Sequence, residues 1–161
     1  MVHPLMIDFQ ELYRRHLCRH SQFGLNVLHL VAVVGIYLSL YRIVFSLPGS
    51  MWILGAGLAL YLGILLAKLP FRLWLINTVM VLLLLSLAAA APAFPIWGYA
   101  LLIVVLHWFQ NWSHRIYTKA FDMSAYKEKY PKGLPLFLTL SLFELPILLN
   151  YLAFDRRSWA S

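Results

Sequence analysis

Polar side chains with metal-binding chemistry are regularly spaced near the end of a long apolar run, between Leu106 and His114. His107 and His114 are seven residues apart, and on a helix this spacing of two turns puts both imidazoles on nearly the same line. Gln110 and Asn111 lie between them on that face. Such groups are costly in a membrane-type segment unless something binds them. The spacing therefore predicts a ligand-binding edge on this helix.

Further histidines precede this edge in the chain. His16 and His20 are four residues apart and share a helix face, and His29 lies one turn after Asn26 in the first long apolar run. Neutral imidazole suits iron, zinc, copper and nickel. The chain has one cysteine and few carboxylates near these histidines, which disfavours thiolate-rich zinc sites and calcium cages. A transition-metal site is expected; the alternative is a set of interfacial histidines with ordinary hydrogen bonds.

Helical phase sets a condition on this site. His20 and His29 are nine residues apart, so on a continuous helix they point in opposite directions. Both can reach one site only if the chain bends between them. The segment 21–24 can supply that bend, with Ser21 as the N-cap of the next helix.

Glu144 is the second costly residue, because it lies midway along the last apolar run. An unpaired carboxyl group there would be protonated. It is either a packing residue that hydrogen-bonds a neighbouring helix, or it approaches the histidines as a ligand, an orienter of a ligand or a proton relay.

The composition shows which solvent surrounds these residues. Of 161 residues, 62% are hydrophobic and 12% are charged, and the mean hydropathy is +0.76. Soluble domains are about half apolar and about one quarter charged. The chain is therefore expected to be a single-domain integral membrane protein. Its net charge of +7 comes from short loops between apolar runs, which favours headgroup contact and gives no indication of nucleic-acid binding.

The apolar runs predict an all-α fold, a polytopic bundle of about five transmembrane helices preceded by an interfacial amphipathic helix over residues 1–22. Pro135, Glu144 and Pro146 interrupt the last run, so a kinked or re-entrant helix is expected there. The spans are predicted at residues 23–41, 51–67, 73–91, 96–112 and 133–154.

Orientation follows from the basic residues. With five spans, residues 1–22, 68–72 and 113–132 share one side and carry 10 of the 13 Lys and Arg residues. The positive-inside rule then places the N-terminus and the 113–132 loop in the cytoplasm. Five of the six histidines, all except His3, fall in the cytoplasmic third of the bundle.

These residues resemble a known family: the small membrane Fe(II)-dependent 2-hydroxy fatty acid dioxygenases of fungal phytosphingosine α-oxidation and their bacterial relatives. The chain departs from the family pattern at Ser113, where glycine is usual, and at Tyr117-Thr118, where a Phe-Glu pair is usual. The resemblance rests on Tyr13–His29, on Gln110–His114, and on Phe143-Glu144 after Gly133–Pro135.

The resemblance implies a non-haem Fe(II) centre with O2 as co-substrate, which cleaves a 2-hydroxy fatty acid taken from the bilayer and shortens it by one carbon. The expected metal ligands are His20, His29, His107 and His114, of which His107 rests on helical phase alone and not on the resemblance. Gln110 and Glu144 are the candidates for catalytic roles near the metal, and His16, Asn26 and Asn111 are weaker candidates as ligands or orienters.

Three other functions remain open at this stage. A di-iron hydroxylase needs about eight histidines with adjacent pairs, whereas this chain has six and no adjacent pair. A terpene cyclase-type enzyme would use Glu144 as its acid. A non-catalytic haem-binding or transport subunit would use His29 and His107 across the bundle. The sequence gives neither the physiological substrate nor the oligomeric state.

Overall fold

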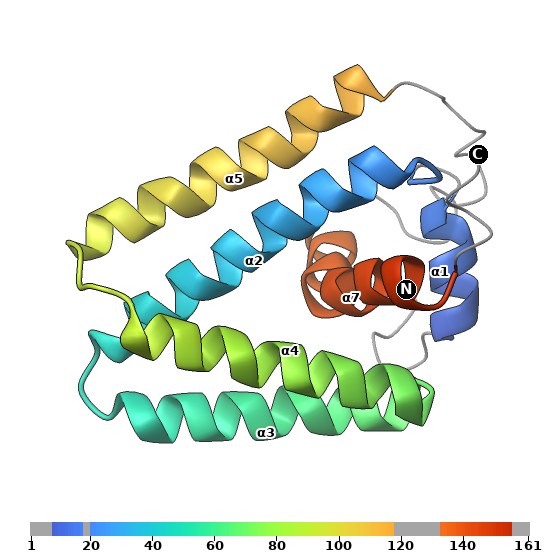
Figure 1. Cartoon of the computed structure of the whole chain (residues 1–161). Helices are drawn as coiled ribbons and strands as arrows, with labels where there is room; N and C mark the ends of the chain where they lie inside the picture. Colours follow the sequence, from blue (N-terminus) through green and yellow to red (C-terminus); the bar gives the residue numbers. More distant parts are fainter. Residues whose placement is uncertain (1–7, 18–19, 118–132, 156–161) are drawn as a thin grey trace.

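The computed structural model describes residues 8–17, 20–117 and 133–155, and all regular structure in these residues is helical (Figure 1). This confirms the all-α fold class. The elements are α1 (Phe9–Leu17), α2 (Phe23–Phe45), α3 (Ser50–Lys68), α4 (Phe71–Ala90), α5 (Ile96–Ile116) and α7 (Leu134–Ala153).

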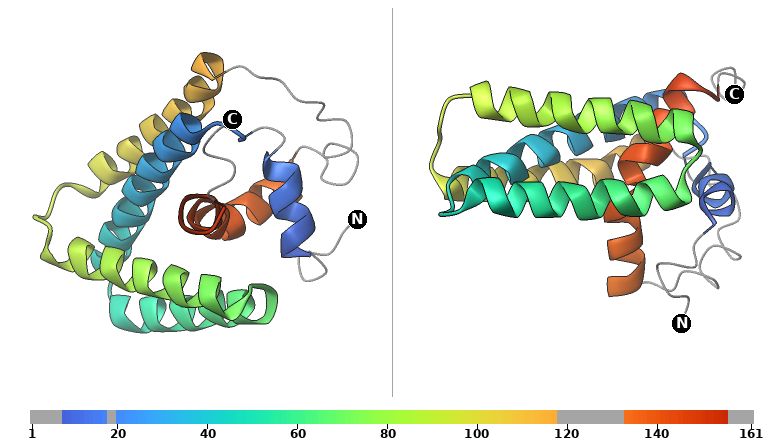
Figure 2. Two further views of the ribbon diagram at one scale, coloured as in Figure 1. Left: turned by 45° about the vertical axis from the view of Figure 1, so that its right-hand side comes forward. Right: turned by 90° about the horizontal axis from the view of Figure 1, so that it is seen from below.

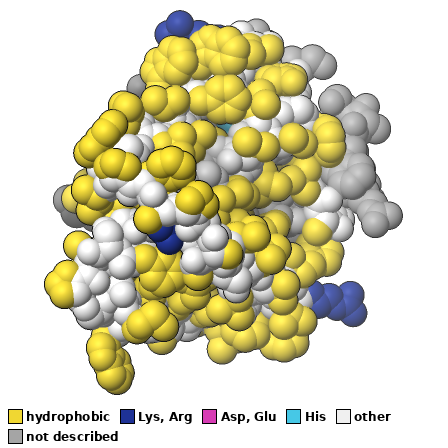
Figure 3. All heavy atoms as spheres, turned by 60° about the vertical axis from the view of Figure 1, so that its left-hand side comes forward, with side chains coloured by type: hydrophobic (Ala, Val, Ile, Leu, Met, Phe, Trp, Pro, Cys, Tyr) yellow, Lys and Arg dark blue, Asp and Glu magenta, His cyan; other side chains and the backbone are white. Residues whose placement is uncertain are grey.

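Among the described helices, α2, α3 and α4 are long and apolar enough to cross a membrane. The surface agrees, because large apolar side chains are exposed along them, including Trp52 and Leu60 on α3 and Val79 on α4. Hydrophobic side chains cover most of the face drawn in Figure 3. The chain therefore has the features of an integral membrane protein, with three of the five predicted spans met by length and composition.

The observed helices α2 and α5 extend beyond their predicted C-terminal ends. α2 continues four residues past Tyr41 and includes Arg42, whose guanidinium donates to the Tyr99 hydroxyl and the Ala88 carbonyl. α5 continues past Trp112 to Ile116, which places His114 inside the helix.

α7 runs as one helix through Pro146, and its ribbon bends between its first and last turns (Figure 2). Proline cannot donate the hydrogen bond to the carbonyl four residues earlier, and its ring displaces that turn, so a kink is expected at this point. The expectation of a kinked helix is met.

α1 differs from the expected interfacial helix. It covers Phe9–Leu17 only, it ends before His20, and residues 1–7 lie outside the described residues. Its apolar side is buried against protein, with the Phe9 ring 6.4 Å from that of Phe143 on α7. The Tyr13 hydroxyl donates a hydrogen bond of 2.8 Å to Asp155. The amphipathic pattern was correct, but the partner of the apolar face is the bundle itself.

α2 is the central helix and packs against α3, α4, α5 and α7, most extensively against α5. The α2–α5 approach is close at Gly35, where an added Cβ would lie 2.6 Å from Leu106 Cδ1. α3 and α4 lie side by side (Figure 1). Between them, the Trp74 indole donates to the Leu62 carbonyl at 2.9 Å. This arrangement brings the start of α2, the end of α5 and the middle of α7 together.

Candidate metal centre

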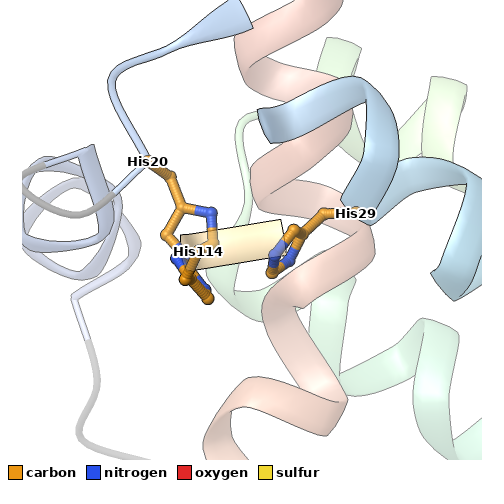
Figure 4. Close-up of side chains that lie close together, drawn as sticks. All are labelled: His20, His29 and His114. Atoms are coloured by element: carbon orange, nitrogen blue, oxygen red, sulfur yellow. The ribbon is translucent and has the colours of Figure 1, made fainter. Parts of the chain in front are cut away.

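Three histidines from separate parts of the chain converge at one end of the bundle (Figure 4). His20 lies between α1 and α2, His29 lies two turns into α2, and His114 lies in the last turn of α5. The ring centroids are 4.5 Å apart for His20–His29, 4.7 Å for His20–His114 and 4.9 Å for His29–His114. One nitrogen from each ring lies within 4.8 Å of the others.

The bend required by the phase of His20 and His29 is present. α1 ends at Leu17 and α2 begins at Phe23. The N-cap is Gln22 and not Ser21, and no side chain makes a capping hydrogen bond there. The Ser21 carbonyl instead accepts a hydrogen bond of 2.9 Å from the Tyr151 hydroxyl, which joins this part of the backbone to α7.

Asn26 holds the bend from inside. Its side chain is fully buried, and its Nδ2 donates to the His20 carbonyl at 2.6 Å and to the Gln22 carbonyl at 2.9 Å. The Gln22 carbonyl also accepts the Asn26 backbone N–H at 3.2 Å, as the first bond of α2. Asn26 therefore fixes the backbone of His20, and its Oδ1 is buried without a hydrogen-bond partner among the described residues.

Glu144 and Gln110 form a hydrogen-bonded support behind His29. The Nδ1 of His29 lies 3.2 Å from Glu144 Oε1, and Gln110 Nε2 donates to the same oxygen at 2.9 Å. The Nε2 of His29 is buried and has no hydrogen-bond partner among the described residues. One ring nitrogen bonded to a carboxylate and the other left open is the arrangement of a metal-ligating histidine.

His107 lies apart from the three converging histidines. It is exposed, and Asn111 donates to its carbonyl at 3.0 Å within α5. A spacing of seven residues keeps His107 on the line of His114 but moves it about 10.5 Å along the helix axis, too far for both to bind one ion. Helical phase predicted the face correctly, and axial distance separates the two residues.

His16 is a neighbour of the cluster. Its ring stacks on that of His20, with centroids 3.8 Å apart, and it is buried. His16 and His107 both line the cavity that opens at the three histidines.

A cavity of about 1020 Å³ extends away from the three histidines. It follows one face of α2 from His29 to Val44, and α3, α5 and α7 supply its other walls. Most of its lining is aliphatic, for example Val33, Leu58 and Ile103. The histidines, Gln110 and Glu144 therefore form the polar end of a long apolar pocket.

The donor set fits a transition metal. Nitrogens that bind one ion at about 2.1 Å lie at most about 4.2 Å apart, so the three imidazoles need only a small contraction to share an ion. Neutral imidazoles without thiolates suit iron, zinc, copper or nickel. Three nitrogens also leave positions free for exogenous ligands.

Some of the residues that shape this site were not identified from the sequence. Tyr151 holds the bend through Ser21, a contact across 130 positions that no local pattern encodes. Tyr37, Tyr41 and Tyr61 line the cavity. Tyr37 and Tyr41 are four residues apart and so share one face of α2, but the sequence does not indicate that this face borders a cavity.

Comparison of the chain with protein-family models, curated proteins and solved structures finds no match.

Proposed function

We propose that this chain is a membrane-embedded non-haem Fe(II) dioxygenase that cleaves 2-hydroxy fatty acids and shortens them by one carbon. The observation that supports it best is the position of the three imidazoles. They meet at the polar end of an apolar cavity, and a carboxylate orients one of them.

His20, His29 and His114 would hold the ion, and the remaining residues would fix these ligands. Glu144 holds the His29 ring so that Nε2 faces the centre, and Gln110 holds Glu144. Asn26 sets the position of His20. When bound, Fe(II) supplies a site for a 2-hydroxy carboxylate and the one-electron chemistry by which O2 reacts with organic substrates.

The cavity favours a long acyl chain as substrate. From His29 to Val44 it follows α2 for about 22 Å, longer than the roughly 15 Å of apolar thickness in one leaflet. At its polar end, the cavity is lined by Arg15, which forms a 2.7 Å ion pair with Glu11. A substrate carboxylate at the histidine end would share Arg15 with Glu11. The 118–132 part of the basic loop, expected to contact an acidic headgroup, lies outside the described residues.

The topology is part of the proposal. α5 and α7 would act as the fourth and fifth spans, with the histidines at the cytoplasmic side. α5 has its polar residues, from His107 to His114, within its last three turns, where a span can meet the interface. α7 is mostly apolar, and its one acidic residue, Glu144, is in hydrogen-bond contact with His29 and Gln110.

The geometry disfavours a haem centre. Two axial histidines must leave the plane between them free for the macrocycle, whereas here a third imidazole lies within 4.9 Å of both others. A cyclase that uses Glu144 as its acid is also disfavoured, because Glu144 Oε1 contacts both His29 and Gln110.

The test uses the full chain purified in lipid nanodiscs. Near-stoichiometric iron without a Soret band, and conversion of 2-hydroxyhexadecanoic acid with O2 to a product one carbon shorter, are the expected results. A Soret band would support the haem alternative. A protein that binds no transition metal under Fe(II) loading would overturn the proposal.

A further inference from the structure

A second polar cluster lies in the cavity, away from the histidines. It consists of Tyr37 and Tyr41 on α2 and Tyr61 on α3. The Tyr37 hydroxyl donates to the Tyr61 hydroxyl at 3.1 Å. The Tyr37 ring centroid lies 6.1 Å from that of Tyr41 and 6.5 Å from that of Tyr61. Three phenols thus meet where the rest of the wall is mostly aliphatic.

The Tyr41 hydroxyl is the unexplained member of this tyrosine cluster. The Tyr37–Tyr61 hydrogen bond joins α2 to α3 and so has a structural role, as polar bonds between membrane helices commonly do. Tyr41 is only 7% exposed, and its hydroxyl has no hydrogen-bond partner among the described residues. A buried polar group without a partner is costly, and phenylalanine would fill the same space without that cost. Tyr41 also lines the cavity, so a ligand can reach it.

The distance from the histidines decides what such a ligand would be. Tyr37 and Tyr41 follow His29 by eight and twelve residues, which places them about 12 and 18 Å away along α2. An extended chain of bonded atoms advances about 1.2 Å per bond. The tyrosine cluster is therefore level with roughly the tenth to fifteenth carbon of an acyl chain whose carboxylate lies at the histidines.

On the α2 side, the wall between the two polar regions is apolar. Val33 and Ile36 line the cavity between His29 and Tyr37. A polar group on the chain near its fifth carbon would face these two side chains, which offer no hydrogen bond; the polar lining residues His107, Asn111 and Ser141 come from α5 and α7. Along α2, the cavity therefore offers hydrogen bonds at two separated levels.

We propose that the tyrosine cluster is a binding subsite for an oxygen substituent, a hydroxyl or a carbonyl, on the distal half of an acyl chain. The Tyr41 hydroxyl provides the hydrogen bond, and the Tyr37–Tyr61 pair completes the polar surface. This inference rests on the proposed function for the placement of the carboxylate. It narrows the substrate class to fatty acids that carry an additional hydroxyl or carbonyl group far from the carboxyl end.

The test measures binding and not turnover. The full chain in nanodiscs is loaded with a fluorescent fatty acid, which is displaced by octadecanoate, 5-hydroxyoctadecanoate or 12-hydroxyoctadecanoate. The two hydroxy isomers have nearly the same partition into lipid, so their ratio reports the subsite. We expect the 12-hydroxy isomer to bind about three- to tenfold more tightly than the 5-hydroxy isomer.

Two variants locate the effect. Tyr41→Phe is expected to remove the preference and leave octadecanoate affinity within about twofold, and it should not lower the Tm of the unliganded protein, because it removes an unpaired hydroxyl. Tyr99→Phe is the matched control; its hydroxyl bonds Arg42 away from the cavity, and it should keep the preference.

The outcomes separate the two proposals. Equal affinities for the two isomers, or a preference that persists in Tyr41→Phe, would overturn the subsite. In either case, displacement of the probe by octadecanoate would still support an acyl-binding cavity. Failure of all three acids to displace the probe would overturn the acyl-binding part of the proposed function, and the subsite with it.

Discussion

The carboxylate of Glu144 lies 3.2 Å from His29 Nδ1, across 115 positions of sequence. The contact joins the kinked helix α7 to the start of α2, and Gln110 from α5 binds the same oxygen. A partly buried acid and a buried histidine are thus hydrogen-bond partners, while His29 Nε2 stays available. Three of the helices that line the cavity, α2, α5 and α7, therefore also fix the orientation of one candidate ligand.

Replacing Glu144 tests whether it orients a ligand or is one. In Glu144→Gln the charge that favours the donating His29 Nδ1–H is lost, and we expect metal affinity to fall about 10- to 100-fold with binding still measurable. The dissociation constant is measured by competition with a chelator of known affinity. Glu11→Gln, which removes a carboxylate that forms an ion pair with Arg15 on α1, serves as the control. Complete loss of metal in Glu144→Gln would instead make this carboxylate a direct ligand.

The ligand set is tested by single replacements. His20→Ala, His29→Ala and His114→Ala should each lower metal affinity by more than the roughly 100-fold that marks loss of an orienting residue. His107→Ala should retain the metal, because His107 lies outside the three converging histidines. Metal content per protein after gel filtration gives the answer. Retention of metal in His114→Ala, or its loss in His107→Ala, would contradict a ligand set made of His20, His29 and His114.

The bend at His20 gives a prediction that links stability to metal binding. Asn26→Ala leaves the His20 carbonyl without its Asn26 donor and removes one of the two donors to the Gln22 carbonyl, and we expect a loss of about 1–3 kcal/mol in the free energy of unfolding. Metal affinity should fall as well, because His20 is no longer held. Chemical unfolding in detergent and chelator competition measure the two effects. Asn111→Ala is the control; its exposed side chain hydrogen-bonds the His107 carbonyl of its own helix, so a change beyond about 0.5 kcal/mol would be unexpected.

Much of this arrangement follows from sequence patterns alone. Uninterrupted apolar runs between Pro48, Pro70 and Pro95 define three helix starts within two residues of those observed. The phase difference between His20 and His29 required a bend, and the chain bends there. These features depend on local spacing, which the sequence displays directly.

Other features depend on contacts between distant segments. Whether Glu144 meets His29 depends on the packing of α7 against α2, and no spacing encodes that distance. Helical phase could not separate His107 from His114, because phase gives direction and not axial position. The apolar face of α1 looks the same in sequence whether lipid or α7 covers it. In each case the missing information is the position of a partner helix.

Tyr13 joins α1 to Asp155, which follows α7, and so holds in place the helix that carries His16. Burial raises the pKa of the Tyr13 phenol above its ordinary value, and the hydrogen bond to Asp155 reinforces the shift. A raised folded-state pKa means that this stabilisation is fully present below the unfolded value of about 10 and is lost as the pH rises above it. We expect amide exchange in α1 to accelerate steeply above about pH 10. Tyr13→Phe should cost about 1–2 kcal/mol at pH 7, through loss of the hydrogen bond, and should remove the alkaline response. Tyr99→Phe, remote from α1, is the control and should keep it. An alkaline response that persists in Tyr13→Phe would assign it to another group.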